Sequence, residues 1–141
     1  MSDKMQALGR RWAALGLEWL PGMLACGPWR VLTVATDGYP MSMFATAHHR
    51  PRGWWGLAGQ PGAAREVIPD FSDRLTELAL LVHVQQAWAD PRAYVMPLSG
   101  LHTAGRWAVC GDPPPGVLAR MAPDGYPTWA EACIAAVEAT R

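Results

Sequence analysis

The sequence predicts an α+β fold, in which an antiparallel β-sheet of about four to five strands is flanked by three helices in a sandwich-like arrangement. Two observations predict this class. Apolar residues recur at helical spacing near the start, in the middle and at the end of the chain. Between these segments lie short runs rich in β-branched and aromatic residues, bounded by Gly and Pro. Strands joined as hairpins, with the helices kept separate, are typical of α+β proteins.

Composition limits the classes of partner. The 141 residues fit one domain spanning residues 1–141, and 50% of them are hydrophobic, which is enough for a core. The formal net charge is zero, so no uniform positive field attracts duplex nucleic acid or an anionic membrane. No apolar run reaches the ~20 residues that span a bilayer, and the N-terminus lacks the apolar region of a secretory signal. We therefore expect neither duplex nucleic acid nor a membrane as a partner.

Residues 2–17 predict the first helix. Ser2 or Asp3 is placed to cap its start, and Gly16 suits its end. Its apolar stripe, with spacings of three and four, consists of Met5, Leu8, Trp12 and Leu15.

The best strand in the sequence is WRVLTVAT, residues 29–36, followed by the hairpin signal Asp37-Gly38. The return strand is expected over residues 39–47, with Pro40 at an edge or in the turn because proline cannot donate to a ladder. Residues 48–69 show no period and are predicted to form a long irregular loop.

The central helix is predicted to start at a cap formed by Ser72 or Asp73 and to reach about Trp88. A helix that is apolar around so much of its circumference is well buried or meets a second partner. His83 is expected on a more polar side, together with Thr76. The expected apolar face consists of Leu75, Leu78, Ala79, Val82 and Gln86, with more apolar surface at Leu80, Leu81, Val84 and Trp88.

Two further strands are expected at residues 93–98 and 106–110, followed by an irregular stretch over residues 111–127. The last helix starts at Thr128, which forms a capping box with Glu131. Its predicted buried stripe consists of Ala130, Cys133, Ile134 and Val137. The three cysteines (Cys26, Cys110 and Cys133) form no CxxC pair and indicate reduced, buried thiols in a cytosol.

Motifs for catalysis, metal binding and cofactor binding are not found. The sequence has no GxSxG elbow, P-loop, GxGxxG or zinc-finger spacing, and its carboxylates are scattered. His48 and His49 are adjacent, and neighbouring residues on a strand point in opposite directions, so they do not suit one metal ion. We therefore predict no catalytic residue, no metal site and no cofactor.

The basic and aromatic run HHRPRGWW, residues 48–55, is the candidate ligand site. Arginine offers paired donors for phosphate, and tryptophan offers a flat face on which a base can stack. The alternative is an ordered loop whose tryptophans cover the sheet and whose arginines face water. The predicted ligand-binding residues are His48, Arg50, Arg52, Trp54, Trp55 and Arg65.

The chain resembles a group of small tailed-phage proteins with a phage ABA-sandwich domain, the NinX-like group. The resemblance rests on IPDFSD followed by an apolar helix ending at Trp88, and on TWAEA followed by an Ala-rich helix, with a looser match over residues 19–23. It implies a sheet flanked by helices and a phage accessory protein in the host cytoplasm. No site residue is carried over from it.

These observations lead to three functional hypotheses. The first is a non-enzymatic, homo-oligomeric protein that acts against host defence by sequestering a small nucleotide-like immune signal. It rests on the basic and aromatic run and on the eight tryptophans, which suit stacking and interfaces unless they fill the core. The second is a protein–protein inhibitor of a host defence enzyme. The third, weaker hypothesis is a small nucleotide-processing hydrolase.

Overall fold

The computed structural model describes residues 2–26, 29–31, 33–34, 40–43, 54–56 and 68–141. In these residues the protein is α+β, with three α-helices and antiparallel strands. Their strands form separate ladders of two, three and two strands, so a single sheet of four to five strands is not confirmed. The chain divides into two compact units, Met1–Thr76 and Glu77–Arg141, which are described one at a time. The single domain stays a prediction.

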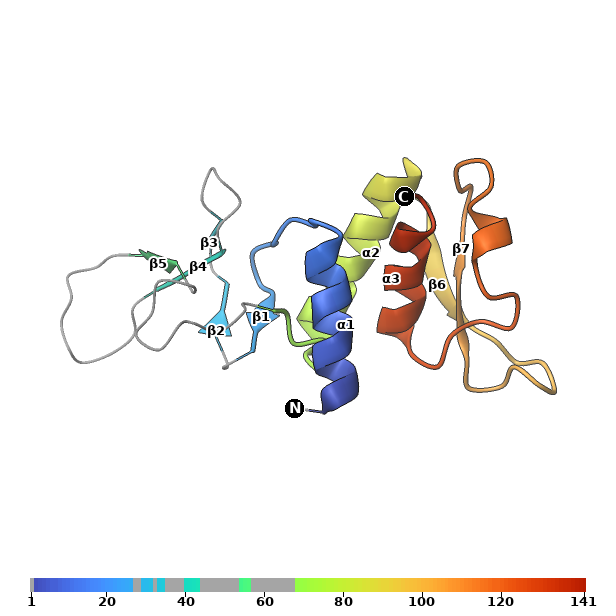
Figure 1. The fold of residues 1–141 in the computed structure, drawn as a ribbon, viewed down its shortest axis with the longest axis horizontal. Helices are drawn as coiled ribbons and strands as arrows, with labels where there is room; N and C mark the ends of the chain where they lie inside the picture. Colours follow the sequence, from blue (N-terminus) through green and yellow to red (C-terminus); the bar gives the residue numbers. More distant parts are fainter. Residues whose placement is uncertain (1, 27–28, 32, 35–39, 44–53, 57–67) are drawn as a thin grey trace. The chain divides into compact units, whose positions relative to one another are not determined.

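The first helix of the first unit is α1 (Asp3–Ala14) (Figure 1). It has the predicted start, because Ser2 Oγ accepts a hydrogen bond from the Met5 N–H at 3.3 Å. It also has the predicted stop, since Gly16 adopts a φ of +64°, the left-handed conformation that glycine tolerates best. The helical residues end three positions before the predicted limit at residue 17.

The core of the first unit contains a pair of contacting aromatic rings among aliphatic side chains. The Trp12 and Trp19 rings meet edge to face with centroids 5.0 Å apart. Gly9 lets α1 approach the backbone at Ile68 closely, because a Cβ atom at residue 9 would lie 3.1 Å from the Ile68 Cβ. The buried apolar residues of this unit include Leu8, Trp12, Trp19, Met23, Ala25, Val31, Ile68 and Phe71.

Strands β1 (Leu24–Ala25) and β2 (Trp29–Arg30) form an antiparallel pair. Residues 68–70 extend this pair on the other side of β1, through a bridge between Ala25 and Pro69. The Asp70 N–H donates to the Leu24 carbonyl at 2.8 Å. The predicted strand over residues 29–36 is divided between two ladders, because residues 29–30 pair with β1 and residues 33–34 belong to a second ladder.

The second ladder has the order β3–β4–β5, with β3 (Thr33–Val34), β4 (Pro40–Met43) and β5 (Trp54–Gly56) (Figure 1). Strands β3 and β4 pair antiparallel, as the predicted hairpin requires, but Val34 pairs with Pro40, one residue away from the Met41 partner that a two-residue turn at residues 37–38 would give. That turn lies outside the described residues. Pro40 is the first residue of β4, a position where a missing N–H is tolerated. The prediction of an irregular segment is wrong at β5, where two adjacent aromatic residues favour a strand.

Helix α2 (Arg74–Trp88) matches the predicted central helix closely, but the prediction of its buried side is wrong. The buried side carries the two polar residues Thr76 (0% exposed) and His83 (2%) together with apolar Leu80, Val84 and Trp88. The predicted apolar face is the exposed one, at Leu75, Leu78 and Val82. Both sides are rich in apolar residues, so periodicity alone does not distinguish them.

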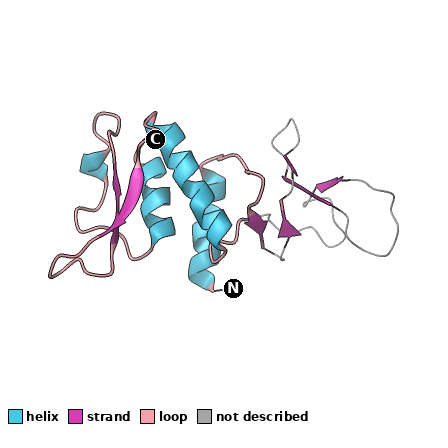
Figure 2. Ribbon diagram, turned by 180° about the vertical axis from the view of Figure 1, so that it is seen from behind, coloured by secondary structure: helices cyan, strands magenta, loops and turns pink. Residues whose placement is uncertain are grey.

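In the second unit, helix α3 (Trp129–Glu138) packs on one face of a hairpin formed by β6 (Tyr94–Pro97) and β7 (Trp107–Cys110). Figure 2 shows the strands of this hairpin beside α3. Both predicted strands and the last helix are confirmed. The segment predicted to be irregular contains one short 3₁₀ helix, η2 (Leu118–Arg120).

Helix α3 is buried on almost all sides. Its predicted cap is confirmed in part: Thr128 Oγ1 accepts from the Glu131 N–H at 3.1 Å, while Glu131 Oε2 is buried without a hydrogen bond among the described residues. The Ala136 carbonyl, near the C-terminal end of α3, accepts a hydrogen bond from the Trp88 indole N–H at 3.0 Å. The buried residues of α3 are Trp129, Ala130, Ala132, Cys133, Ile134, Ala135, Ala136 and Val137.

Candidate functional site

The predicted ligand site falls largely outside the described residues. Its described part is β5, where Trp54 pairs with Met43 and Trp55 with Ser42. Strand β5 is at the edge of its ladder, with β4 on its only described side. The other predicted ligand residues, His48, Arg50, Arg52 and Arg65, lie outside the described part of the chain.

The register of β5 constrains any stacking site built on it. Trp54 and Trp55 occupy consecutive positions of one strand, and consecutive strand positions belong to opposite faces of a sheet. Only one of the two positions can therefore belong to the face that receives a ligand. A second stacking group for the same ligand has to come from another segment or from another copy of the chain.

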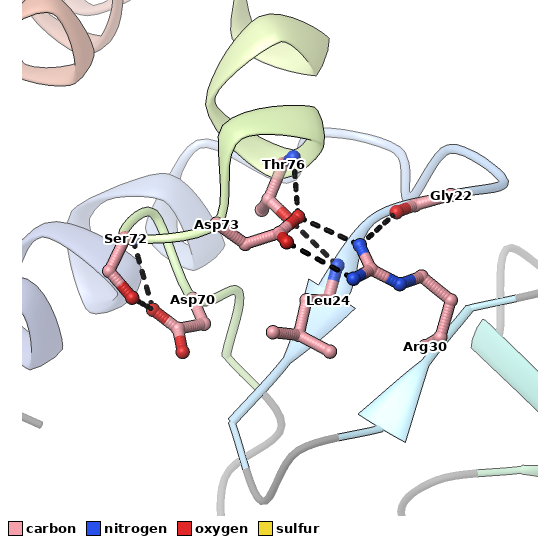
Figure 3. A network of polar contacts seen from close by, with 7 residues as sticks. All are labelled: Gly22, Leu24, Arg30, Asp70, Ser72, Asp73 and Thr76. Atoms are coloured by element: carbon pink, nitrogen blue, oxygen red, sulfur yellow. Dashed lines mark hydrogen bonds and ion pairs between the residues drawn. The ribbon is translucent and has the colours of Figure 1, made fainter.

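The best-defined polar cluster lies at the start of α2, and Figure 3 shows it from close by. Asp73 is the residue before the helix, and its Oδ2 atom accepts from the Thr76 N–H at 3.0 Å and from the Thr76 hydroxyl at 2.8 Å. That hydroxyl in turn accepts from the Leu24 N–H of β1 at 2.6 Å. Asp73 is thus the cap of α2, and the neighbouring Ser72 instead donates to Asp70.

Arg30 of β2 completes this cluster. Its two terminal nitrogens reach the two carboxylate oxygens of Asp73 at 2.8 and 3.1 Å, a paired geometry specific to arginine. One of them also donates to the Gly22 carbonyl at 2.8 Å. The cluster therefore ties β1, β2 and the start of α2 together within the first unit.

The electrostatics of this cluster indicate a structural role. The hydrogen bonds from Arg30 lower the pKa of Asp73 from 3.8 to about 2, although burial opposes the shift and Thr76 supports it. A carboxylate with so low a pKa is a poor general base at neutral pH. Because both Asp73 oxygens already accept hydrogen bonds, we assign the cluster to the architecture of the first unit and not to catalysis.

The remaining candidates from the sequence differ in their surroundings. His83 is buried in α2, whereas it was expected at the polar boundary of the helix. Among the described residues, no three His, Cys, Asp or Glu side chains are grouped so that they could hold a metal ion.

The cysteines are not alike. Cys133 is buried, as predicted, and burial raises the pKa of its thiol. Cys26 and Cys110 are only partly buried, which corrects the expectation of three buried thiols. Burial and the nearby Asp70 raise the pKa of the Cys26 thiol to about 11, so little reactive thiolate forms at neutral pH.

The tryptophans are mainly core residues where their side chains are described. Trp12, Trp19, Trp88 and Trp129 are all at most 8% exposed, and Trp107 is half-buried. The alternative interpretation of the tryptophan excess, that most of them fill the core, is confirmed for these four. The ligand hypothesis therefore depends on β5 and its neighbours in sequence.

Sequence reasoning missed the role of Arg30 and the exposed side of α2. Arg30 and Asp73 are 43 residues apart, so no local pattern links them. The only available signal was a charged residue inside an otherwise apolar strand, which needs a partner if it is buried.

Comparison with known proteins found no matching family model, no similar curated protein and no similar solved structure. The resemblance to phage ABA-sandwich proteins thus stays a prediction. In the part of the chain that the structure describes, no helix is both long enough and apolar enough to cross a membrane.

Proposed function

We propose that this protein is a phage accessory protein that acts without catalysis by binding and sequestering a small nucleotide-like immune signal in the host cytoplasm. The observation that supports the proposal most is the run of residues 48–55, in which two arginines and two histidines directly precede an edge strand that begins with two tryptophans. Guanidinium groups bind phosphate, and an indole ring stacks on a base.

A titration tests this proposal. The full chain is titrated with nucleoside mono-, di- and triphosphates and with cyclic oligonucleotides, and binding is followed by calorimetry. We expect stoichiometric binding of at least one of them without turnover. We expect a variant with Arg50→Gln and Arg52→Gln to lose this binding, because it lacks the two guanidinium groups that would donate to phosphate.

A matched control for this variant is available on α1, where Arg10 and Arg11 are also close in sequence and exposed. Arg10→Gln with Arg11→Gln makes the same change in net charge and should leave binding intact. If both double variants bind equally well, the run is not the site. If no member of the panel binds the wild-type chain, or if one is hydrolysed, the sequestration proposal is wrong.

A second candidate function, inhibition of a host defence enzyme by direct contact, is favoured by α2. In the second unit, Leu78 and Val82 are 40% and 39% exposed and lie four residues apart, on one side of the helix. Exposed apolar stripes are typical of surfaces that bind another protein. Leu78→Glu should abolish co-purification with such a target and should leave nucleotide binding unchanged, which separates the two functions.

A further inference from the structure

The outer face of the β6–β7 hairpin is apolar, and its residues are exposed on β6 and half-buried on β7. The register pairs Tyr94 with Cys110 and Met96 with Ala108, so these four residues share one face. The opposite face carries Val109, which is 7% exposed, and it is the face on which α3 packs. Tyr94 is 53% exposed and Met96 is 37% exposed. A sheet with one face on the core normally presents polar residues on the other, and this hairpin does not.

The edge of this hairpin is less suitable than its face for binding a partner. The Leu98 N–H donates to the Arg106 carbonyl at 2.8 Å. Because backbone groups of alternate residues point to the same side of a strand, the backbone N–H and C=O groups of Tyr94 and Met96 also point toward β7. The other edge of β6, which pairs with no described strand, is then formed by Val95 and Pro97, and proline has no N–H to donate. A partner is therefore expected to cover the face and not to add a strand.

At the end of the hairpin near Tyr94, Arg92 and Asp112 have opposite charges and are separated by the carboxylate of Asp90. Asp90 accepts a hydrogen bond from the Arg92 N–H at 2.9 Å and another from the Asp112 N–H at 2.7 Å. One carboxylate thus holds Arg92 on the β6 side and Asp112 on the β7 side. Both residues are exposed. At the other end, Arg106 is bonded to carbonyls of its own chain at residues 124 and 125.

We propose that this face binds a second copy of the chain, through a two-fold axis parallel to the strands. Such an axis places β6 of each copy over β7 of the other, with equivalent ends of the hairpins together. Tyr94 then lies over Cys110 of the second copy and Met96 over its Ala108, so each large residue meets a small one. Arg92 lies over Asp112 of the second copy, and the symmetry repeats this ion pair.

The alternative two-fold axis, perpendicular to the strands, is less favourable. It places β6 over β6 of the second copy, so that Tyr94 and Met96 meet each other, and it separates Arg92 from the opposing Asp112. Size and charge complementarity therefore favour the parallel axis. The apolar part of the contact is small compared with the roughly 800 Å² per partner of a standard interface, so we expect a dimer that dissociates on dilution in the micromolar range.

Sedimentation equilibrium of the full chain over a wide concentration range tests the proposal, without added ligand and with a reductant to prevent disulfides through Cys110. We expect a monomer–dimer equilibrium. Met96→Arg should weaken the dimer about tenfold or more, because it buries a charge at the centre of the contact. The matched control is Val82→Arg on α2, since Val82 has nearly the same exposure, 39% against 37%. It should leave the equilibrium unchanged.

A charge exchange tests the axis even if Met96→Arg fails to fold. Arg92→Asp should weaken the dimer by like-charge repulsion with Asp112, and combining it with Asp112→Arg should restore it. A monomer at all concentrations overturns the proposal, as does a dimer that Val82→Arg disrupts and Met96→Arg does not. Equal effects of the single and the combined exchange overturn the two-fold arrangement. The proposal does not rest on nucleotide binding: a dimer that binds no nucleotide contradicts only the proposed function.

Discussion

Asp73 accepts hydrogen bonds from two separate segments of the first unit, β2 and the start of α2. It caps α2 through Thr76 and receives both terminal nitrogens of Arg30. Asp73→Ala removes the cap and the ion pair together, and we expect it to lower the free energy of unfolding by about 1–2 kcal/mol. Ser72→Ala is the control, because Ser72 is the neighbouring candidate cap and should have a much smaller effect. Equal losses in urea denaturation would show that Asp73 is not the cap.

The same carboxylate predicts how stability depends on pH. Because the pKa of Asp73 is lowered from 3.8 to about 2 in the folded protein, its stabilising contribution is present above pH 3.8. The contribution is lost as the pH falls through about 2, when the folded protein also takes up the proton. The Arg30 side chain is 38% exposed, so screening by solvent reduces the stabilising contribution of its ion pair with Asp73. Asp73→Asn should therefore flatten the acid limb of a melting-temperature profile, and an unchanged limb would contradict this.

Ala89 is strained at the end of α2. Its φ is +51°, the left-handed conformation in which a Cβ is unfavourable. The N–H groups of Ala89 and Asp90 donate to the Gln86 and Gln85 carbonyls, which completes a typical helix end. Ala89→Gly should raise the free energy of unfolding by about 0.5–1 kcal/mol, because it removes this strain. Ala87→Gly, which lies inside the helix, should lower it by a similar amount. Thermal unfolding of both variants measures the contrast, and effects of the same sign would refute it.

At the scale of elements, Trp88 joins α2 to α3 within the second unit. Its indole N–H satisfies the Ala136 carbonyl near the end of α3. Trp88→Phe keeps most of the ring and leaves this carbonyl without its donor, which should cost about 1–3 kcal/mol. Hydrogen exchange should then show weaker protection in the last turn of α3 than at its start. Uniform loss of protection would indicate a packing defect instead.

The elements show which parts of the fold can be predicted from sequence. The caps at Ser2, Asp73 and Thr128 and the β6–β7 hairpin are local signals, and the structure has all of them. The Arg30–Asp73 pair is not local. The buried side of α2 was also not predictable, because the hydroxyl of Thr76 can be buried only when Asp73 and Leu24 bond to it.

For the candidate site, the residue types come from the sequence, and the structure adds only the register of β5. That register excludes a single face carrying both Trp54 and Trp55. A ligand sandwiched between two rings would therefore need a second segment, and a homo-oligomer is one way to supply it. The arginines of the run lie outside the described residues, so their role stays a prediction.

At the scale of the whole molecule, the central claim is that this protein retains a small nucleotide-like ligand. Native mass spectrometry of the full chain, purified from cells with active defence systems, tests it most directly. The account predicts a bound small-molecule mass at a fixed ratio to the protein, which is lost in the variant with Arg50→Gln and Arg52→Gln. A chain that carries no small molecule from such cells, and that acquires none from the nucleotide panel, would contradict it.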